Sequence, residues 1–220
     1  MNQHIIHVYL MPGMAASPII FEHIKLPEDQ FKIHWLEWIM PKPKEALTAY
    51  AQRMAAKVVH ENAVLLGVSF GGILVQEMGA YLKLRKLIIV SSVKTRYELP
   101  RRMRIARFTK AYRLAPTRLA QNVEALAKYT FGKTVKRRVE LYKKYLSVND
   151  KAYLDWAIEQ VVCWDRELAD ENVLHIHGTN DAVFPIKYIT NCKPIKGGTH
   201  IMIINKYKWF NENLPKLILR

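Results

Sequence analysis

The strongest constraint on the fold of this chain is a buried apolar run that ends in a glycine-flanked serine. Residues 63–68 are continuously apolar, which is typical of a strand covered on both faces. Near the end of this run, Gly67, Ser69 and Gly71 are spaced two residues apart. The apolar residues of 71–82 then recur at the three- and four-residue spacing of a helix. A sharp turn between strand and helix crowds the backbone, so the positions two before and two after the serine must be small. The sequence therefore predicts a strand, a strained turn that presents the Ser69 hydroxyl, and a helix.

Strand and helix patterns alternate on both sides of this turn. The expected strands are 5–10, 31–38, 63–68, 87–90, 173–177 and, more weakly, 193–195. Helices are expected to open at Pro43, at Gly71 and near Ile203. Such alternation predicts the α/β class, with a mostly parallel sheet covered by helices on both faces. No stretch reaches the roughly 18 apolar residues that a bilayer span requires.

Residues 94–164 interrupt this pattern with apolar positions spaced by three and four, which predicts four helices and no strand. We therefore divide the chain into a core of residues 1–93 and 165–220 and a helical cap of residues 94–164. The segment 94–151 carries 17 Lys and Arg residues against 4 Asp and Glu residues, a net +13 of the chain's +15. Mixed charges would solubilise these helices equally well, so the one-sided sign favours an anionic partner.

A serine hydroxyl becomes a nucleophile only beside an oriented base. His200 is the best candidate base, since it follows two glycines in a loop after a strand. Asp181 directly follows the preceding strand and is the best candidate acid, ahead of Asp155 and Asp165 in the insertion. The remaining candidate histidines lie on or beside strands, where structural roles are expected: His4, His7, His34, His175 and His177. The chain order Ser, Asp, His is the order found when such a triad is built on an α/β sheet.

A tetrahedral intermediate at Ser69 needs two N–H donors for its oxyanion. The residue after the nucleophile, Phe70, is expected to supply one. The loop after the first strand contains Gly13, which permits a close turn, and the N–H of Met14 is the expected second donor, with Ala15 as the alternative. Met14, Phe70 and Phe184 are also expected to form apolar walls near Ser69.

Four sequence segments together resemble the α/β-hydrolase superfamily: LLGVSFGG around Ser69, HGTNDAVFP around Asp181, GGTHIMI around His200, and the PGM loop. The resemblance covers most of the chain outside the insertion. It implies a serine hydrolase with a Ser-His-Asp triad, a helical cap, and neither a metal nor an organic cofactor. Two features depart from the family. Pro12 replaces the common His before the glycine, and the chain begins at what looks like the third strand, which implies about six strands.

The favoured activity is hydrolysis of a carboxylic ester or thioester through an acyl-serine intermediate on Ser69. The basic, aromatic-rich cap favours a small acyl substrate that carries an anionic group, or peripheral contact with an anionic membrane. A nucleic-acid partner is not expected, because no recognition motif accompanies the pI of about 9.8. Two other functions stay open: a binding module that uses the basic cap, and a non-hydrolytic lyase that uses the same triad.

The two cysteines, Cys163 and Cys192, have no CxxC spacing and are expected to be reduced thiols. The N-terminal apolar run is short and flanked by histidines, so it is interpreted as a strand. A cytoplasmic location is expected from these features.

Overall fold

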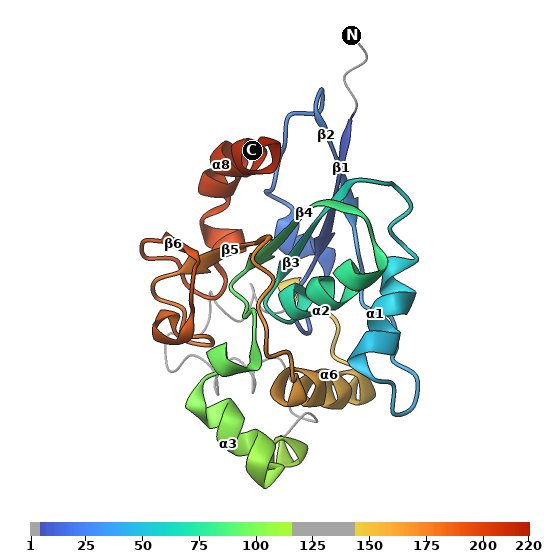
Figure 1. Ribbon diagram of the computed structural model, residues 1–220, viewed down its shortest axis with the longest axis vertical. Coiled ribbons are helices and arrows are strands. Elements are labelled where there is room, and N and C mark those ends of the chain that lie inside the picture. Colours follow the sequence, from blue (N-terminus) through green and yellow to red (C-terminus); the bar gives the residue numbers. More distant parts are fainter. Residues whose placement is uncertain (1–4, 116–143) are drawn as a thin grey trace.

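Six strands form one parallel sheet in the computed structural model, which describes residues 5–115 and 144–220 (Figure 1). The strands are β1 (Ile6–Met11), β2 (Phe31–Trp35), β3 (Ala63–Val68), β4 (Leu84–Val90), β5 (Val173–Gly178) and β6 (Lys193–Ile195). Their order across the sheet is β2-β1-β3-β4-β5-β6, and every neighbouring pair is parallel. The predicted α/β class with a parallel sheet of about six strands is confirmed.

Helices cover both faces of this sheet. Helices α1 (Leu47–Ala55) and α2 (Phe70–Met78) lie on one face, and α8 (Tyr207–Leu219) lies on the other (Figure 1). The short α7 (Met202–Asn205) precedes α8. The 3₁₀ turns are η1 (Pro18–Phe21), η2 (Gly79–Tyr81), η3 (Arg96–Glu98), η4 (Ala111–Leu114) and η6 (Ile186–Tyr188).

Alternation along the central strands divides the core into two layers. On β1, Tyr9 and Met11 pack toward α1 and α2, whereas Val8 and Leu10 pack toward η1 and α8. Residues on β3 alternate in the same way, and all six are buried. Because both faces are covered, strand β3 is a continuous apolar run rather than an alternating one.

Several predicted boundaries were wrong. Helix α1 begins at Leu47 rather than at Pro43, because residues 42–45 form a turn. In this turn the Glu45 carboxylate accepts the Lys42 N–H at 2.8 Å, and Lys44 adopts a left-handed φ of 56°. Strand β2 ends at Trp35 rather than at residue 38, since the chain then bends toward the loop after β1. The closing helix is divided into α7 and α8 around Lys206.

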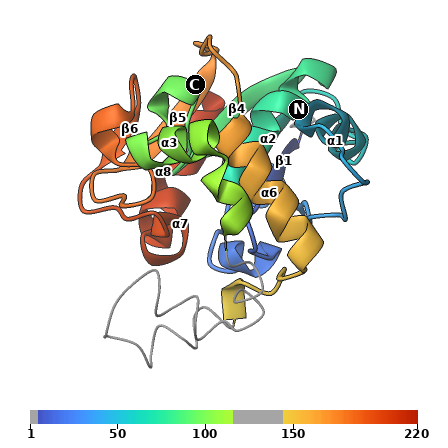
Figure 2. The same ribbon diagram turned by 90° about the horizontal axis from the view of Figure 1, so that it is seen from below.

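Between β4 and β5 the described residues form helices α3 (Arg101–Thr109) and α6 (Lys151–Cys163) and no strand. The expected helix at 119–126 lies outside the described residues, as does most of the one at 135–146. Helix α6 packs against α2 and α3, and the Trp156 indole donates to the Glu45 carbonyl at 2.7 Å. Both helices lie beyond the carboxyl ends of the strands (Figures 1 and 2). Within the described ranges, no helix combines the length and the apolar character needed to cross a bilayer.

Candidate active site

Ser69 occupies a strained turn between β3 and α2. Its φ of 54° and ψ of −121° lie in a region that non-glycine residues rarely adopt, at a cost on the order of 1–3 kcal/mol. Two hydrogen bonds hold this conformation. The Ser69 N–H donates to the Val90 carbonyl at 2.9 Å, and the Ser92 hydroxyl donates to the Ser69 carbonyl at 2.7 Å. The turn is therefore anchored to the end of the neighbouring strand β4.

The glycines on either side of Ser69 are required by close backbone approach. A Cβ atom at Gly67 would lie 2.2 Å from the Gly71 carbonyl oxygen. A Cβ atom at Gly71 would lie 2.3 Å from the Pro12 carbonyl oxygen, on the loop after β1. The absence of a Cβ at Gly67 allows the turn to be tight, and its absence at Gly71 allows the loop after β1 to lie close to Ser69.

The structure brings together the three side chains that the sequence predicted as a triad. The Nε2 atom of His200 lies 2.9 Å from the Ser69 Oγ, and its Nδ1 atom lies 2.9 Å from an Asp181 carboxylate oxygen. The loop that carries His200 is held against the Asp181 loop, because the Asn180 N–H donates to the Gly198 carbonyl at 2.8 Å. The imidazole is only 19% exposed, so its position is defined by packing as well as by these two bonds.

The Asp181 carboxylate is buried and has a partner on each oxygen. One oxygen faces His200, and the other accepts the N–H groups of Val183 at 2.8 Å and of Phe184 at 2.9 Å. Burial by itself raises the pKa of Asp181, but the hydrogen bond and charge of His200 and the Phe184 N–H outweigh it, so the pKa lies below its ordinary value. Asp181 is therefore an ionised acceptor that holds the Nδ1 proton of His200.

Gly13 places a peptide group beside the nucleophile. A Cβ atom at Gly13 would lie 3.3 Å from the Ser69 Cβ. The Gly13 carbonyl accepts the Trp38 indole N–H at 2.9 Å and the Ala16 N–H at 3.1 Å. In a planar trans peptide the N–H points opposite to the carbonyl, so these bonds direct the Met14 N–H away from Trp38.

Phe70, the other expected oxyanion donor, begins helix α2 directly after the turn. Its N–H is one of the amides at a helix start that has no partner within its own helix. The Phe70 and Trp38 rings are stacked, with 4.9 Å between centroids and 7° between planes. Trp38 therefore contacts both segments that carry the expected oxyanion donors, although nothing in the local sequence pattern marks it for this position.

The site lies where the strand order reverses. The chain passes from β1 outward to β2 and then returns to the other side of β1 with β3. Sheets of this kind bind ligands beyond the carboxyl ends of the strands at that point. The Gly13 loop follows β1 and Ser69 follows β3, so the candidate site lies at this point of the sheet.

Solved structures with the same arrangement cover nearly all of the chain. A bromoperoxidase from Bacillus anthracis aligns at 20% identity with a TM-score of 0.65, covering 98% of this chain and 92% of its own. A hydrolase from Oleispira antarctica aligns at 12% identity with a TM-score of 0.74, covering 99% and 92%. An esterase from Exiguobacterium antarcticum aligns at 17% identity with a TM-score of 0.66, covering 98% and 92%.

The chain has the α/β-hydrolase fold. The resemblance seen in the sequence is thus confirmed at the level of the fold. No protein-family model matches the sequence, and no curated protein matches it.

Two buried histidines, His175 and His177, stabilise the loop that carries Asp181. The His177 Nε2 atom lies 2.8 Å from the Phe184 carbonyl, to which it donates, so its Nδ1 atom accepts the His175 Nε2–H at 3.0 Å. Burial lowers the pKa of His177 and lowers that of His175 to about 3. Both rings are therefore neutral at ordinary pH. The structural role expected from their strand positions extends to holding the turn that positions Asp181.

Helix α3, which lies between β4 and β5, places basic side chains beside the loop that carries Asp181. The Arg102 guanidinium donates to the carbonyls of Ala182 at 3.0 Å and Val183 at 2.9 Å, directly after Asp181. On the same helix, α3, the side chains of Ile105 and Phe108 are 62% and 91% exposed. The described part of the insertion thus presents arginines and apolar groups on one surface near the site.

Proposed function

We propose that this protein is a serine hydrolase that cleaves a carboxylic ester or thioester through an acyl intermediate on Ser69. The observation that carries the proposal is the continuous hydrogen-bond chain from Ser69 through His200 to Asp181, each link 2.9 Å long. Each group has the role that such a chain requires: a nucleophile, a base and an ionised acid. The esterases and hydrolases of similar fold are consistent with this chemistry.

In the first half of the reaction, His200 Nε2 accepts the Ser69 proton as Oγ attacks the substrate carbonyl carbon. Asp181 stabilises the imidazolium that forms and remains ionised itself. The N–H groups of Phe70 and Met14 donate to the tetrahedral oxyanion. His200 then gives its proton to the departing alcohol or thiol, which leaves an acyl group on Ser69.

In the second half, His200 takes a proton from a water molecule that attacks the acyl carbon. The second tetrahedral intermediate uses the same two N–H donors. Its collapse returns the proton to Ser69 Oγ and releases the carboxylic acid. Water and the substrate ester are thereby converted to one acid and one alcohol or thiol, and the enzyme is regenerated.

The basic surface near the site supports an acyl substrate that carries an anionic group. The Arg101 and Arg104 side chains are exposed on α3, the helix whose Arg102 binds the loop beyond Asp181. An anion in the substrate would be attracted to this surface during encounter. The exposed Ile105 and Phe108 beside these arginines would equally suit peripheral contact with an anionic membrane. A nucleic-acid partner is not proposed.

A fluorophosphonate probe tests the nucleophile directly, because it reacts with an activated serine. The wild type should be labelled, and Ser69→Ala should abolish labelling. Ser147→Ala, which changes an exposed serine, serves as the matched control and should label normally. A folded wild type that is not labelled would remove the hydrolase proposal and favour the binding module.

A panel of acyl esters and thioesters of increasing chain length then distinguishes the substrate classes. If all are bound but none releases an acid, the non-hydrolytic lyase becomes the better assignment. Anionic and neutral esters should be compared at low and high salt, since screening weakens only charge attraction. Arg104→Gln should reduce kcat/KM for anionic esters alone. The control Arg85→Gln alters an exposed arginine near the opposite end of the sheet and should not.

Anionic and neutral vesicles, added to the same assay, distinguish membrane contact from substrate steering. Binding to anionic vesicles alone would support the membrane proposal.

The cytoplasmic location expected from the sequence also stays a proposal, and cell fractionation would test it.

A further inference from the structure

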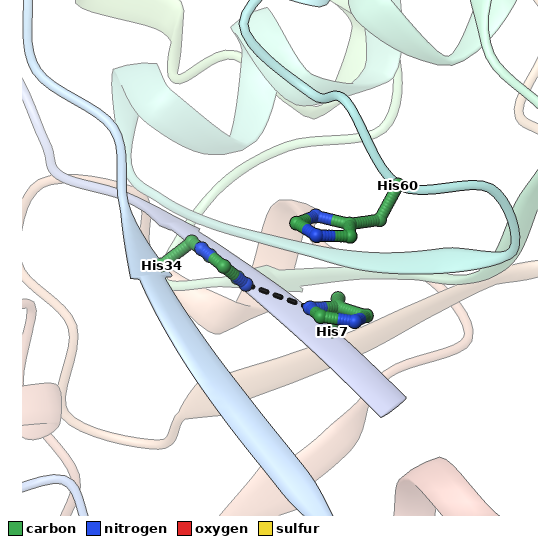
Figure 3. A group of neighbouring side chains, drawn as sticks. All are labelled: His7, His34 and His60. Carbon is green, nitrogen blue, oxygen red and sulfur yellow. Dashed lines mark hydrogen bonds between the residues drawn. The ribbon is translucent and has the colours of Figure 1, made fainter. Parts of the chain in front are cut away.

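Three histidines from separate segments converge near the amino ends of β1 and β3, beside strand β2 (Figure 3). His7 lies near the start of β1, His34 lies on β2, and His60 lies in the segment before β3. One ring nitrogen from each can be chosen so that all three lie within 4.8 Å of one another. The side chains are partly buried, so each ring keeps access to solvent.

A short nitrogen–nitrogen contact joins two of the three imidazoles. The Nδ1 atom of His7 and the Nε2 atom of His34 face each other at 2.8 Å. Such a pair shares a single proton, and the nitrogen without the proton is a free base. A metal ion could replace that proton, which is the ordinary exchange when imidazoles become ligands.

Tyr9 orients the third imidazole. Its hydroxyl lies 2.6 Å from the Nδ1 atom of His60, and it accepts the Val59 N–H at 3.3 Å. With Nδ1–H donated to the Tyr9 oxygen, the Nε2 lone pair of His60 is available. Metal-binding histidines usually have their second nitrogen held in this way by a neighbouring polar group.

The sheet register explains why these residues meet. Tyr9 pairs with His34 across the β1–β2 ladder, and His7 pairs with Lys32. Alternation places His7 and Tyr9 on the same face of β1, next to the His34 side chain on the adjacent strand. His60 then lies over this face, with its ring stacked on His7 at 3.5 Å between centroids and 7° between planes.

We propose that His7, His34 and His60 form a binding site for one divalent transition-metal ion of the zinc class. Imidazole nitrogen is a preferred ligand for Zn²⁺, Co²⁺, Ni²⁺ and Cu²⁺, and three imidazoles leave a fourth position for water. Zn–N bonds of about 2.0–2.1 Å place tetrahedral ligand atoms roughly 3.3 Å apart. The nitrogens reach that spacing through rotation of partly exposed rings, which must end the His7–His60 stacking.

Among the residues that the structure describes, the metal-ligand group consists of these three histidines, and nearby charges modify the strength of the site. Burial, together with the charges of the other histidines and Lys32, lowers the pKa of His7 and of His34. Neutral rings favour ligation, whereas the nearby Lys32 ammonium repels a cation. A bound ion would connect the edge strand β2, strand β1 and the segment before β3. The proposed ion would therefore stabilise the edge of the sheet. It would play no part in the reaction proposed at Ser69.

Titration of the tag-free full chain with Co²⁺ and Zn²⁺ tests the proposal. The wild type should bind one equivalent of Co²⁺ with the visible absorption of a four-coordinate site, and Zn²⁺ should displace it. His34→Gln and His60→Gln should each weaken binding about tenfold or more. The exposed His23 supplies the matched control, and His23→Gln should bind as the wild type does.

His200→Gln separates this site from the triad, since it removes the catalytic imidazole and should leave the Co²⁺ spectrum unchanged. His60 lies outside the strands, so His60→Gln remains informative if His34→Gln does not fold. The proposal is overturned if the wild type shows no saturable binding. It is also overturned if a folded His60→Gln binds with wild-type affinity, or if His200→Gln alone loses the ion.

Discussion

The two ends of the sheet use histidine in opposite ways. At the carboxyl end, His200 lies between a hydroxyl and a carboxylate, so each ring nitrogen has a different partner and the position of its proton is defined. At the amino end, two of the three clustered histidines face each other through nitrogen atoms, so they compete for one proton. The first arrangement suits the proposed transfer of a proton between defined groups, whereas the second leaves lone pairs for the proposed cation. The chemistry of an imidazole is therefore set by what its second nitrogen contacts.

The largest test of this contrast is removal of the catalytic imidazole. His200→Gln should lower kcat for ester hydrolysis by about 10⁴–10⁶, because Ser69 loses its base. His23→Gln, which alters an exposed histidine, should change kcat by less than about twofold. Steady-state kinetics with a chromogenic ester measures both. Residual activity of His200→Gln within tenfold of the wild type would contradict the proposed role of His200 as the base.

The next effect concerns Asp181, the carboxylate that accepts the Nδ1 proton of His200 and so fixes its position. Asp181→Asn should lower kcat by about 10³–10⁴, since an amide in this position can stabilise the wrong tautomer of the imidazole. KM should change little, because the carboxylate is buried. The same chromogenic assay measures this variant. A raised KM with an unchanged kcat would show that Asp181 shapes the substrate pocket and does not orient His200.

Buried histidines between the two ends should make the protein sensitive to acid. The folded pKa of His175 is about 3, below its unfolded value near 6.5, so the unfolded state binds the extra proton between these values. Stability should therefore fall as the pH drops below about 6.5, at up to about 1.4 kcal/mol per pH unit for this group. Urea unfolding between pH 7 and pH 4.5, with a chelator present, measures the slope.

His175→Gln is the matched variant for this slope, because its amide can still donate to His177 without titrating. It should reduce the pH dependence by about one proton. His177 and the clustered His7 and His34 also have lowered pKa values and add to the slope. An unchanged slope in His175→Gln would mean that other groups account for the acid sensitivity.

The smallest expected effect tests how the oxyanion donors are positioned. Trp38→Phe removes the N–H that binds the Gly13 carbonyl but keeps an aromatic ring against Phe70. The Met14 peptide would then be held less firmly, and kcat should fall about tenfold with KM nearly unchanged. Trp209→Phe, on α8, is the control and should leave kcat unaltered. Equal changes in kcat and KM would indicate general loosening of the site instead.

Local features of the sequence were enough to predict much of the fold and the residues of the candidate triad. The turn at Ser69 is recognisable because its glycine contacts join residues only four apart, Gly67 and Gly71. Asp181 and His200 each follow a strand within a few residues, so their placement at the carboxyl end of the sheet follows from the strand pattern. Boundaries such as the start of α1 were missed because a single carboxylate, that of Glu45, stabilises the preceding turn.

The sequence by itself determined the parallel α/β architecture and the serine, acid and histidine at one end of it, because periodicity and tight turns depend on neighbours in the chain. Only the tertiary structure decided that Trp38 holds the Gly13 carbonyl and that His7, His34 and His60 meet. These contacts join residues 25 or more positions apart. They depend on the register of β1 with β2 and on the path of the chain before β3. Register and chain path follow from the packing of the whole sheet, and no local pattern encodes them.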